Sequence, residues 1–247
     1  MDEKTAKPVC LVIGAGDGVG GGIAKAFADE GFGVVITRRA RNLDQLEALA
    51  GEIRQRGGVV YPLGVDARSE DETIALFEHI ERDIGPLEVV VFNIGANVRF
   101  GIAETTTRVF TKVWEMACLA GFLAGREAAK VMVPRGRGTI LFTGATASVR
   151  GREGFAAFAA AKHGLRAIAQ SMARELGPKG IHVAHVICDG SIDGVFSRQN
   201  IADLDQRLAE DRVLKPADIA ATYVALYHQP RSAWTHELDL RPWSEPW

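Results

Sequence analysis

The fold is decided by one stretch near the amino terminus, Val9-Cys10-Leu11-Val12-Ile13-Gly14-Ala15-Gly16-Asp17-Gly18-Val19-Gly20. Its first part, residues 9–13, is apolar at every position, which is typical of a strand covered on both faces of a parallel sheet. Glycines follow directly, and apolar residues then recur at helical spacing over residues 23–28. A strand, a glycine-rich turn and a helix in this order bring free backbone N–H groups to the positive end of a helix dipole. The stretch therefore predicts a phosphate-binding turn.

Strand-like and helix-like patterns alternate through the rest of the chain. Further strands are predicted at residues 34–36, 59–65, 89–92, 139–142, 183–187 and 237–240. The longest helices are predicted at about 108–133 and 155–176, and Ser69 with Glu72 has the spacing of a helix capping box. We therefore expect an α/β fold of Rossmann type, with a doubly wound, mostly parallel seven-stranded sheet and helices on both faces. Ligands of such a fold bind at the carboxyl ends of the strands.

Composition narrows the function classes. The chain has 247 residues, 47% of them hydrophobic, and we predict a single domain over residues 1–247, with a core at about 8–242 and a short tail at 243–247. The formal net charge is -2 and the sequence has no cluster of basic residues. We therefore expect neither nucleic acid nor a membrane as a partner. Cys10, Cys118 and Cys188 lack metal-ligand spacing, which argues against a disulfide framework and against a metal site. With no signal peptide and no apolar run of about 18 residues, the sequence predicts a cytoplasmic protein.

Several motifs together resemble those of one large enzyme family. The spacing of Gly14, Gly18 and Gly20 is similar to the Gly-x-x-x-Gly-x-Gly motif of the short-chain dehydrogenase/reductase family. Phe92-Asn93-Ile94-Gly95 stands where this family usually has Asn-Asn-Ala-Gly, and Asp189-Gly190-Ser191-Ile192 stands where Pro-Gly-x-Val is usual. The resemblance covers about residues 8–242. It implies an oxidoreductase that uses a nicotinamide cofactor on a small carbonyl or alcohol substrate.

The resemblance also implies which residues bind the cofactor. They lie in the glycine loop, at the ends of the next strands, on the long helix and in the late loop: Gly14, Gly16, Gly18, Val19, Gly20, Arg38, Arg39, Asp66, Ala67, Asn93, Gly95, Lys162, Gly190 and Ile192. Arg38 stands where NAD-preferring members usually carry an Asp, and together with Arg39 it favours a 2′-phosphate, so we expect NADP(H) rather than NAD(H). Asp17 opposes this choice, because it stands where NADP-preferring members often have a cation. A further alternative is that the two arginines are surface residues that form ion pairs with Glu30 or Asp44.

The resemblance fails at the positions that carry the family's chemistry. Where the family has a Tyr, a Ser thirteen residues before it and an Asn, this chain has Phe158, Ala145 and Cys118. Only the Lys of that set is kept, as Lys162. Since a positioned general acid typically contributes about 10²–10⁴ in rate, ordinary carbonyl reduction is expected to be poor.

Few groups are candidates to replace the missing proton donor. Those that follow the fifth predicted strand are Thr143, Thr146, Ser148 and Glu153, and they share their loop with Arg150 and Arg152. The tyrosines do not help, because they lie far from the long helix in sequence: Tyr61, Tyr223 and Tyr227. The nearby histidines are interpreted as surface or structural residues: His163, His182 and His185.

Two hypotheses about function follow. The chain is either an NADP(H)-dependent oxidoreductase with a substituted active site or a nucleotide-binding pseudoenzyme with a regulatory or oligomeric role. In both cases we expect a homodimer or homotetramer, because Trp243 and Trp247 would be exposed in a monomer and because small residues suit close helix packing between subunits. These small residues are Ala117, Ala120, Gly121, Ala124, Ala156, Ala159, Ala160 and Ala167.

Overall fold

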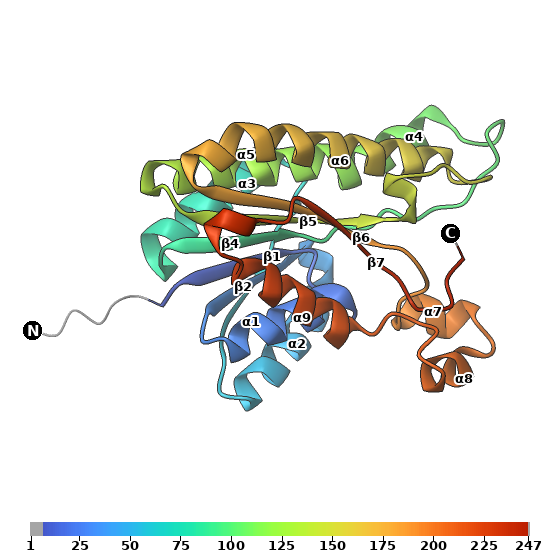
Figure 1. Ribbon diagram of the computed structural model, residues 1–247, viewed down its shortest axis with the longest axis horizontal. Coiled ribbons are helices and arrows are strands. Elements are labelled where there is room, and N and C mark those ends of the chain that lie inside the picture. Colours follow the sequence, from blue (N-terminus) through green and yellow to red (C-terminus); the bar gives the residue numbers. More distant parts are fainter. Residues whose placement is uncertain (1–6, 247) are drawn as a thin grey trace, which may run out of the picture.

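Seven parallel strands form one sheet in the structure, a computed structural model that describes residues 7–246 (Figure 1). The strands are β1 (Val9–Ile13), β2 (Gly33–Arg38), β3 (Val59–Gly64), β4 (Leu87–Phe92), β5 (Gly138–Ala145), β6 (Ile181–Cys188) and β7 (Glu237–Leu240). Their order is β3-β2-β1-β4-β5-β6-β7, and every neighbouring pair runs parallel. The switch point therefore lies between β1 and β4. The predicted doubly wound α/β fold is confirmed.

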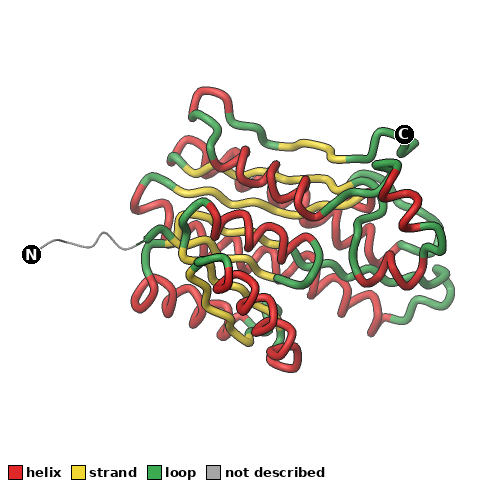
Figure 2. Tube along the Cα trace, turned by 90° about the horizontal axis from the view of Figure 1, so that it is seen from below, coloured by secondary structure: helices red, strands yellow, loops and turns green. Residues whose placement is uncertain are grey.

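Helices cover both faces of the sheet (Figure 1, Figure 2). One face carries α1 (Val19–Asp29), α2 (Leu43–Gln55) and α9 (Pro216–Tyr227), which share one apolar core with the sheet. The other face carries α3 (Glu70–His79), α5 (Ala120–Met132) and α6 (Ala156–Leu176), which share a second core. The short helices α7 (Val195–Asn200) and α8 (Leu204–Ala209) lie beyond the carboxyl end of β6 (Figure 1). Within residues 7–246, no helix is both long and apolar enough to cross a bilayer.

The helix predicted at about 108–133 is not regular throughout. The structure divides it into α4 (Thr107–Trp114), a π-helical turn (Glu115–Leu119) and α5. The π-helical turn buries Cys118 against α6, where a Cβ on Gly164 would lie only 2.7 Å from Cys118 Sγ. The predicted helical stretch is present, but its π-helical turn was not predicted, because an apolar repeat of about 3.6 residues does not reveal a single inserted residue.

The capping box predicted at Ser69 is half formed. Ser69 Oγ accepts a hydrogen bond from Glu72 N at 3.2 Å, as the spacing predicts. Glu72 Oε2 does not reach back to Ser69 N and instead accepts a hydrogen bond from Asp66 N at 2.8 Å. Glu72 therefore fixes the turn that follows β3 and with it the position of Asp66.

The small residues expected at a subunit interface are mostly used within the subunit. Several are buried in it: Ala117, Ala120, Gly121, Ala124 and Ala159. A Cβ on Gly121 would contact the side chain of Leu165, so its small size allows α5 to approach α6. Ala160 and Ala167 are the exposed members of the set. The small residues of α5 therefore have a packing role in the monomer and do not by themselves mark an interface.

Candidate cofactor site and active site

The glycine loop between β1 and α1 has a backbone that requires glycine at two positions. Gly14 has a φ of 90°, and its carbonyl oxygen accepts a hydrogen bond from Asn93 Nδ2 at 3.1 Å. A Cβ on Gly20 would lie 2.5 Å from Gly14 O, which excludes a side chain there. Gly18 is the N-cap of α1 and provides no side-chain cap, so the first N–H groups of the helix remain available to an anion.

Two adjoining cavities follow the carboxyl ends of the strands on either side of the switch point. The larger, of about 670 Å³, extends from the glycine loop along β5 and β6 to α6 and α7. The smaller, of about 200 Å³, lies between the glycine loop and the ends of β2 and β3. The two share part of their walls and form one groove: Gly14, Gly16, Asn93, Ile94 and Gly95 line both.

Every residue expected to bind the cofactor lies on this groove. The larger cavity is lined by Gly14, Gly16, Gly18, Val19, Gly20, Asn93, Gly95, Lys162, Gly190 and Ile192. The smaller cavity is lined by Arg38, Arg39, Asp66 and Ala67, and it also shares Gly14, Gly16, Asn93 and Gly95. The uncapped start of α1 suits a pyrophosphate, and the arginines suit a further phosphate. The residues present therefore fit a nicotinamide dinucleotide phosphate.

Three arginines surround the smaller cavity. Arg38 Nη1 donates to Gln45 Oε1 at 2.5 Å, and Arg39 lies beside it on the cavity wall. Arg68 also lines the cavity and donates to the Asp66 carboxylate at 2.9 and 2.5 Å. Arg68 was not predicted as a site residue, and its only signal in the sequence is its place two residues after Asp66.

The arginine cluster carries an unfavourable concentration of positive charge. Burial lowers the pKa of Arg39, and the neighbouring charges of Arg41 and Arg68 lower it further. The hydrogen bonds from Arg68 in turn lower the pKa of Asp66, which stays ionised. A bound anion would relieve this repulsion, so the smaller cavity is suited to a phosphate.

The structure bears on two sequence-based arguments against a phosphate here. Asp17 lines the larger cavity and is not among the residues that line the smaller one. Within residues 7–246, Arg38 and Arg39 form no ion pair with Glu30 or Asp44. Glu30 instead accepts from His228 Nε2 at 2.9 Å.

Lys162 lines the larger cavity, although its side chain is almost completely buried. Its Nζ donates hydrogen bonds to Thr143 O at 2.8 Å and to Ile94 O at 3.1 Å. Phe158 lies one turn earlier on α6, with its ring centroid 5.9 Å from Nζ. Burial lowers the pKa of Lys162 to about 8, against a smaller opposing effect of Cys188. Two of the three N–H bonds thus hold the ends of β4 and β5, and one is left for a ligand.

Of the three residues that replace the family's Tyr, Ser and Asn, two line the larger cavity and one does not. Phe158 and Ala145 both line the larger cavity, which therefore meets a phenyl ring and a methyl group where the family has hydroxyl groups. Cys118 lines neither cavity and lies in the π-helical turn, where burial raises the pKa of its thiol. Cys188, which was not selected as a site residue, lines the larger cavity, and burial raises its pKa to about 12. Neither thiol is an acid of suitable strength near pH 7.

The candidate substitute donors are engaged elsewhere or lie outside the cavity. Thr146 Oγ1 donates to the Asp189 carboxylate. Ser148 Oγ is fully buried and accepts a hydrogen bond from Ala145 N at 3.1 Å. Glu153 is exposed and does not line the larger cavity. None of the three is therefore placed to donate a proton to a bound carbonyl.

The last candidate donor, the hydroxyl group of Thr143, forms a hydrogen bond with a tyrosine that is distant in sequence. Tyr223, on α9, has its hydroxyl 2.7 Å from Thr143 Oγ1 at the end of β5. It is fully buried in the core that α9 shares with the sheet, and this burial raises its pKa well above the usual value. Tyr223 therefore engages the hydroxyl group of Thr143 in a hydrogen bond but does not itself line the cavity.

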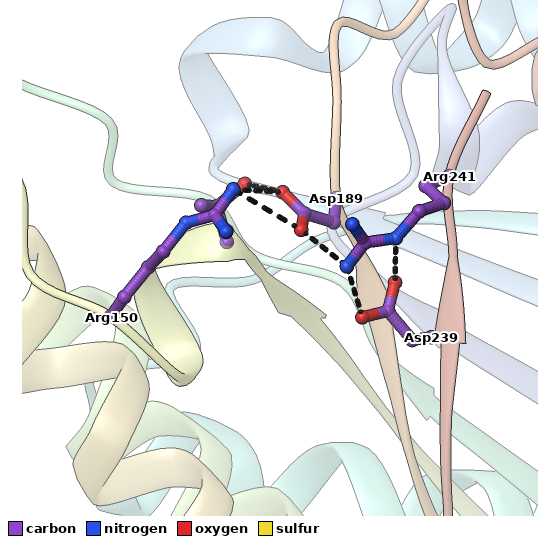
Figure 3. A network of polar contacts seen from close by, with 5 residues as sticks. Arg150, Asp189, Asp239 and Arg241 are labelled. Atoms are coloured by element: carbon purple, nitrogen blue, oxygen red, sulfur yellow. Dashed lines mark hydrogen bonds and ion pairs between the residues drawn. The ribbon is translucent and has the colours of Figure 1, made fainter. Parts of the chain in front are cut away.

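Asp189, which stands where the family has Pro, holds the loop after β6 in place (Figure 3). Its buried carboxylate accepts from Arg241 Nη2 at 2.9 Å and from Arg150 Nη2 at 3.3 and 3.4 Å. Arg241 also donates to Asp239 at 2.7 Å, so two carboxylates and two guanidinium groups form one network (Figure 3). This network fixes Arg150 at the wall of the larger cavity.

The histidines near the site have structural or surface positions. His163 is exposed, whereas His182 and His185 are buried in β6. His185 Nδ1 lies 3.0 Å from Glu237 Oε2, and burial lowers the pKa of His185 to about 4, so it is neutral near pH 7. Over residues 7–246, no group of three or more His, Cys, Asp or Glu side chains is arranged to hold a metal ion.

Comparison with known proteins identifies the family. The sequence matches the short chain dehydrogenase family over residues 8–204. The chain belongs to this family. The 3-oxoacyl-[acyl-carrier-protein] reductase of Bos taurus is 29% identical over 223 residues, which are 90% of this chain and 92% of that protein. A crystal structure of a short-chain dehydrogenase from Rhodopseudomonas palustris is 51% identical, has a TM-score of 0.82 and covers 96% of this chain and 99% of its own.

A structure with bound cofactor is also similar. Actinorhodin polyketide ketoreductase with NADPH is 25% identical to this short-chain dehydrogenase, with a TM-score of 0.86 and 96% of each chain covered. In this short-chain dehydrogenase the glycine loop, Asn93 and Lys162 all lie on the groove, whereas Phe158 and Ala145 present no hydroxyl group to it. The site can thus bind and orient a dinucleotide, but it offers no proton at residue 158.

We predict that Lys162→Met changes how the stability of the protein depends on pH. The fold disfavours the protonated lysine, so burial destabilises the folded state below a pH of about 8 and no longer does so above 10.5, where the amine is neutral in both states. Between these limits the wild type should gain about 1.4 kcal/mol per pH unit relative to the variant. Chemical denaturation across this range measures the difference, with exposed Lys112→Met as the control. A difference that does not change with pH would contradict the prediction.

Proposed function

We propose that this short-chain dehydrogenase binds NADP(H) along the groove and is an oxidoreductase for a small carbonyl or alcohol substrate, with slow proton transfer. The observation that carries the proposal is the groove itself, which joins the uncapped glycine loop to Lys162 on one side and to three arginines on the other. The arginine cluster supports NADP(H) over NAD(H), because charge-assisted, bidentate hydrogen bonds suit a 2′-phosphate. The NADPH in the similar polyketide ketoreductase supports the same choice.

Different residues of the groove would bind different parts of the cofactor. The first N–H groups of α1 would hold the pyrophosphate, Arg38 and Arg39 the 2′-phosphate, and Lys162 the ribose beside the nicotinamide. A bound reduced nicotinamide supplies a hydride to a carbonyl carbon, and the carbonyl oxygen must then gain one proton to become an alcohol. Phe158 has none to give, so the proton comes from solvent.

A pseudoenzyme remains the second candidate, and one specific observation favours it. The hydroxyl groups of Thr143, Thr146 and Ser148 each already have a hydrogen-bond partner, so none of the three replaces the acid at position 158. Under this hypothesis the groove binds NADP(H) and the bound state alone is the functional output. Cofactor calorimetry combined with a screen of aldehydes, ketones and quinones separates the two, because binding without turnover supports the pseudoenzyme.

We predict that Arg38→Asp weakens the binding of NADPH by about 1–3 kcal/mol, the range for losing a charge-assisted hydrogen bond. The affinity for NADH should change much less, since NADH has no 2′-phosphate. Isothermal titration calorimetry with both cofactors measures the effect. Arg174→Asp is the control, because Arg174 on α6 is exposed and does not line the groove. An unchanged NADPH affinity in Arg38→Asp would place the phosphate elsewhere.

We also predict that Phe158→Tyr combined with Ala145→Ser raises carbonyl reduction by at least about 100-fold, the scale of one restored general acid. Both positions line the larger cavity, and the positive charge of Lys162 would stabilise the phenolate of the new Tyr. Initial rates of NADPH oxidation with a carbonyl panel measure the gain. The single variant Phe158→Tyr shows how much of that gain the Ala145→Ser change contributes. A wild type that already reduces carbonyls rapidly, and keeps that rate in Phe158→Ala, would mean that the acid lies elsewhere.

We further propose that the protein is a homodimer or homotetramer. Large aromatic side chains along α4 and α5 are exposed: Phe110 by 42%, Trp114 by 40% and Phe122 by 42%. Trp243 in the tail is 77% exposed, whereas Trp247 lies outside the described residues. Exposed aromatic groups on neighbouring helical turns are typical of protein interfaces, so they support assembly better than the buried small residues do.

We predict an oligomer in sedimentation equilibrium at micromolar concentration and a monomer for the double variant Phe110→Asp, Trp114→Asp. The two carboxylates would have to be desolvated in the interface, which makes association unfavourable. Leu43→Asp is the control, because Leu43 is an exposed apolar residue on α2. A monomeric wild type, or a double variant that assembles unchanged, would refute the assigned interface.

A further inference from the structure

The larger cavity has a cationic wall that cofactor binding does not account for. Arg150 and Arg152 both line the cavity from the loop between β5 and α6. Among residues 7–246, Asp17 in the glycine loop is the only carboxylate on the cavity wall. Aromatic side chains provide the apolar part of the lining: Phe155, Phe158 and Phe196. The cavity thus combines guanidinium groups with an apolar surface.

The guanidinium group of Arg150 is held in place, but not all of its hydrogen-bond donors are used. Only its Nη2 contacts the Asp189 carboxylate, at 3.3 and 3.4 Å, and these distances exceed the usual 2.7–2.9 Å of charge-assisted bonds. Within residues 7–246, its Nε and Nη1 make no hydrogen bond. The Arg150 side chain is 43% exposed, whereas that of Asp189 is 1% exposed and is also bound by Arg241 (Figure 3). Arg150 therefore keeps free donors while its position is already set.

Arg152 adds a second cation with no partner. It is exposed, and within the part of the chain that the structure describes its guanidinium group forms no ion pair or hydrogen bond. Only Gly151 lies between Arg152 and Arg150 in the chain, and the two arginines line the same cavity. The planar fork of an arginine matches the two oxygens of a carboxylate, so this pair is suited to hold one.

We infer that Arg150 and Arg152 bind a carboxylate group of the substrate, and that Asp189 is a positioning residue for Arg150. The substrate is then a keto acid or hydroxy acid whose apolar body lies against Phe155, Phe158 and Phe196. This inference rests on the proposed oxidoreductase function, because it places the carbonyl group in the same cavity. The phosphates of the cofactor have their own donors in the start of α1 and in the arginines of the smaller cavity.

Paired probes that differ only in charge test the inference. Pyruvate, phenylpyruvate and 3-benzoylpropanoate are each compared with the corresponding amide by calorimetry, in the presence of saturating NADP⁺ so that no reduction occurs. At least one acid should bind about 10-fold or more tightly than its amide, and rising salt should reduce this ratio. Arg152→Gln and Arg150→Gln should each bring the ratio near one, while Arg150→Lys should keep part of it. Arg174→Gln, an exposed residue elsewhere on α6, is the control.

The outcomes separate this inference from the proposed function. If no acid in the panel binds more tightly than its amide, or if both Gln variants keep the ratio, the inference is wrong while NADP⁺ binding still stands. If the Gln variants instead lose NADP⁺ affinity and the acid ratio is unchanged, the two arginines belong to the cofactor site and the inference is also wrong. If NADP⁺ does not bind at all, the proposed function fails, and titration of the same probes into the free protein still tests the carboxylate site.

Discussion

The groove depends on one buried ammonium group. Lys162 Nζ is held by the carbonyl oxygens of Thr143 and Ile94, which lie at the carboxyl ends of β5 and just after β4. A buried cation without a carboxylate partner is costly, and these two hydrogen bonds offset part of that cost. The bonds also require α6 to lie close to the ends of the two strands. Phe158 then faces the cavity because it is one turn before Lys162 on the same side of the helix.

Because Lys162 has this structural role, its presence alone does not indicate that the protein is a catalyst. Lys162 connects α6 to β4 and β5 whether or not residue 158 carries a hydroxyl group. Its loss would remove a hydrogen-bond donor from two backbone carbonyl groups, so the fold itself favours keeping it. The presence of Lys162 is therefore compatible with an enzyme and with a pseudoenzyme. Only the hydroxyl positions, Phe158 and Ala145, separate the two hypotheses chemically.

The sequence predicted the parts of the structure that have local patterns. The central strands β1 and β4 are apolar or buried at every position because helices cover both faces, and the glycine loop is recognisable because Gly14 and Gly20 have no room for a side chain. The π-helical turn before α5 was not predicted, since one inserted residue leaves the apolar pattern almost unchanged. The small residues do not decide the question of a subunit interface, because close packing of α5 on α6 and close packing between subunits require the same residue types.

Contacts between distant residues decide the chemistry of the site, and no local pattern indicates them. Tyr223 and Thr143 are 80 residues apart in sequence, yet their hydrogen bond removes one candidate donor. Asp189 could be read only as a departure from Pro, whereas in the fold its carboxylate lies between Arg150 and Arg241 (Figure 3). Arg68 becomes relevant only because β3 ends beside β2.

The distribution of charge along the groove links the two proposals. The chain as a whole carries a formal charge of -2, but three arginines surround the smaller cavity and two line the larger one. In each group a carboxylate holds an arginine in place: Asp66 binds Arg68, which also lies 3.9 Å from Glu115, and Asp189 binds Arg150. These carboxylates neutralise part of the charge and fix the geometry, and the remaining charge is left for a ligand. The same arrangement at both ends implies two anionic groups to be bound, and a dinucleotide phosphate accounts only for the one beside Arg38.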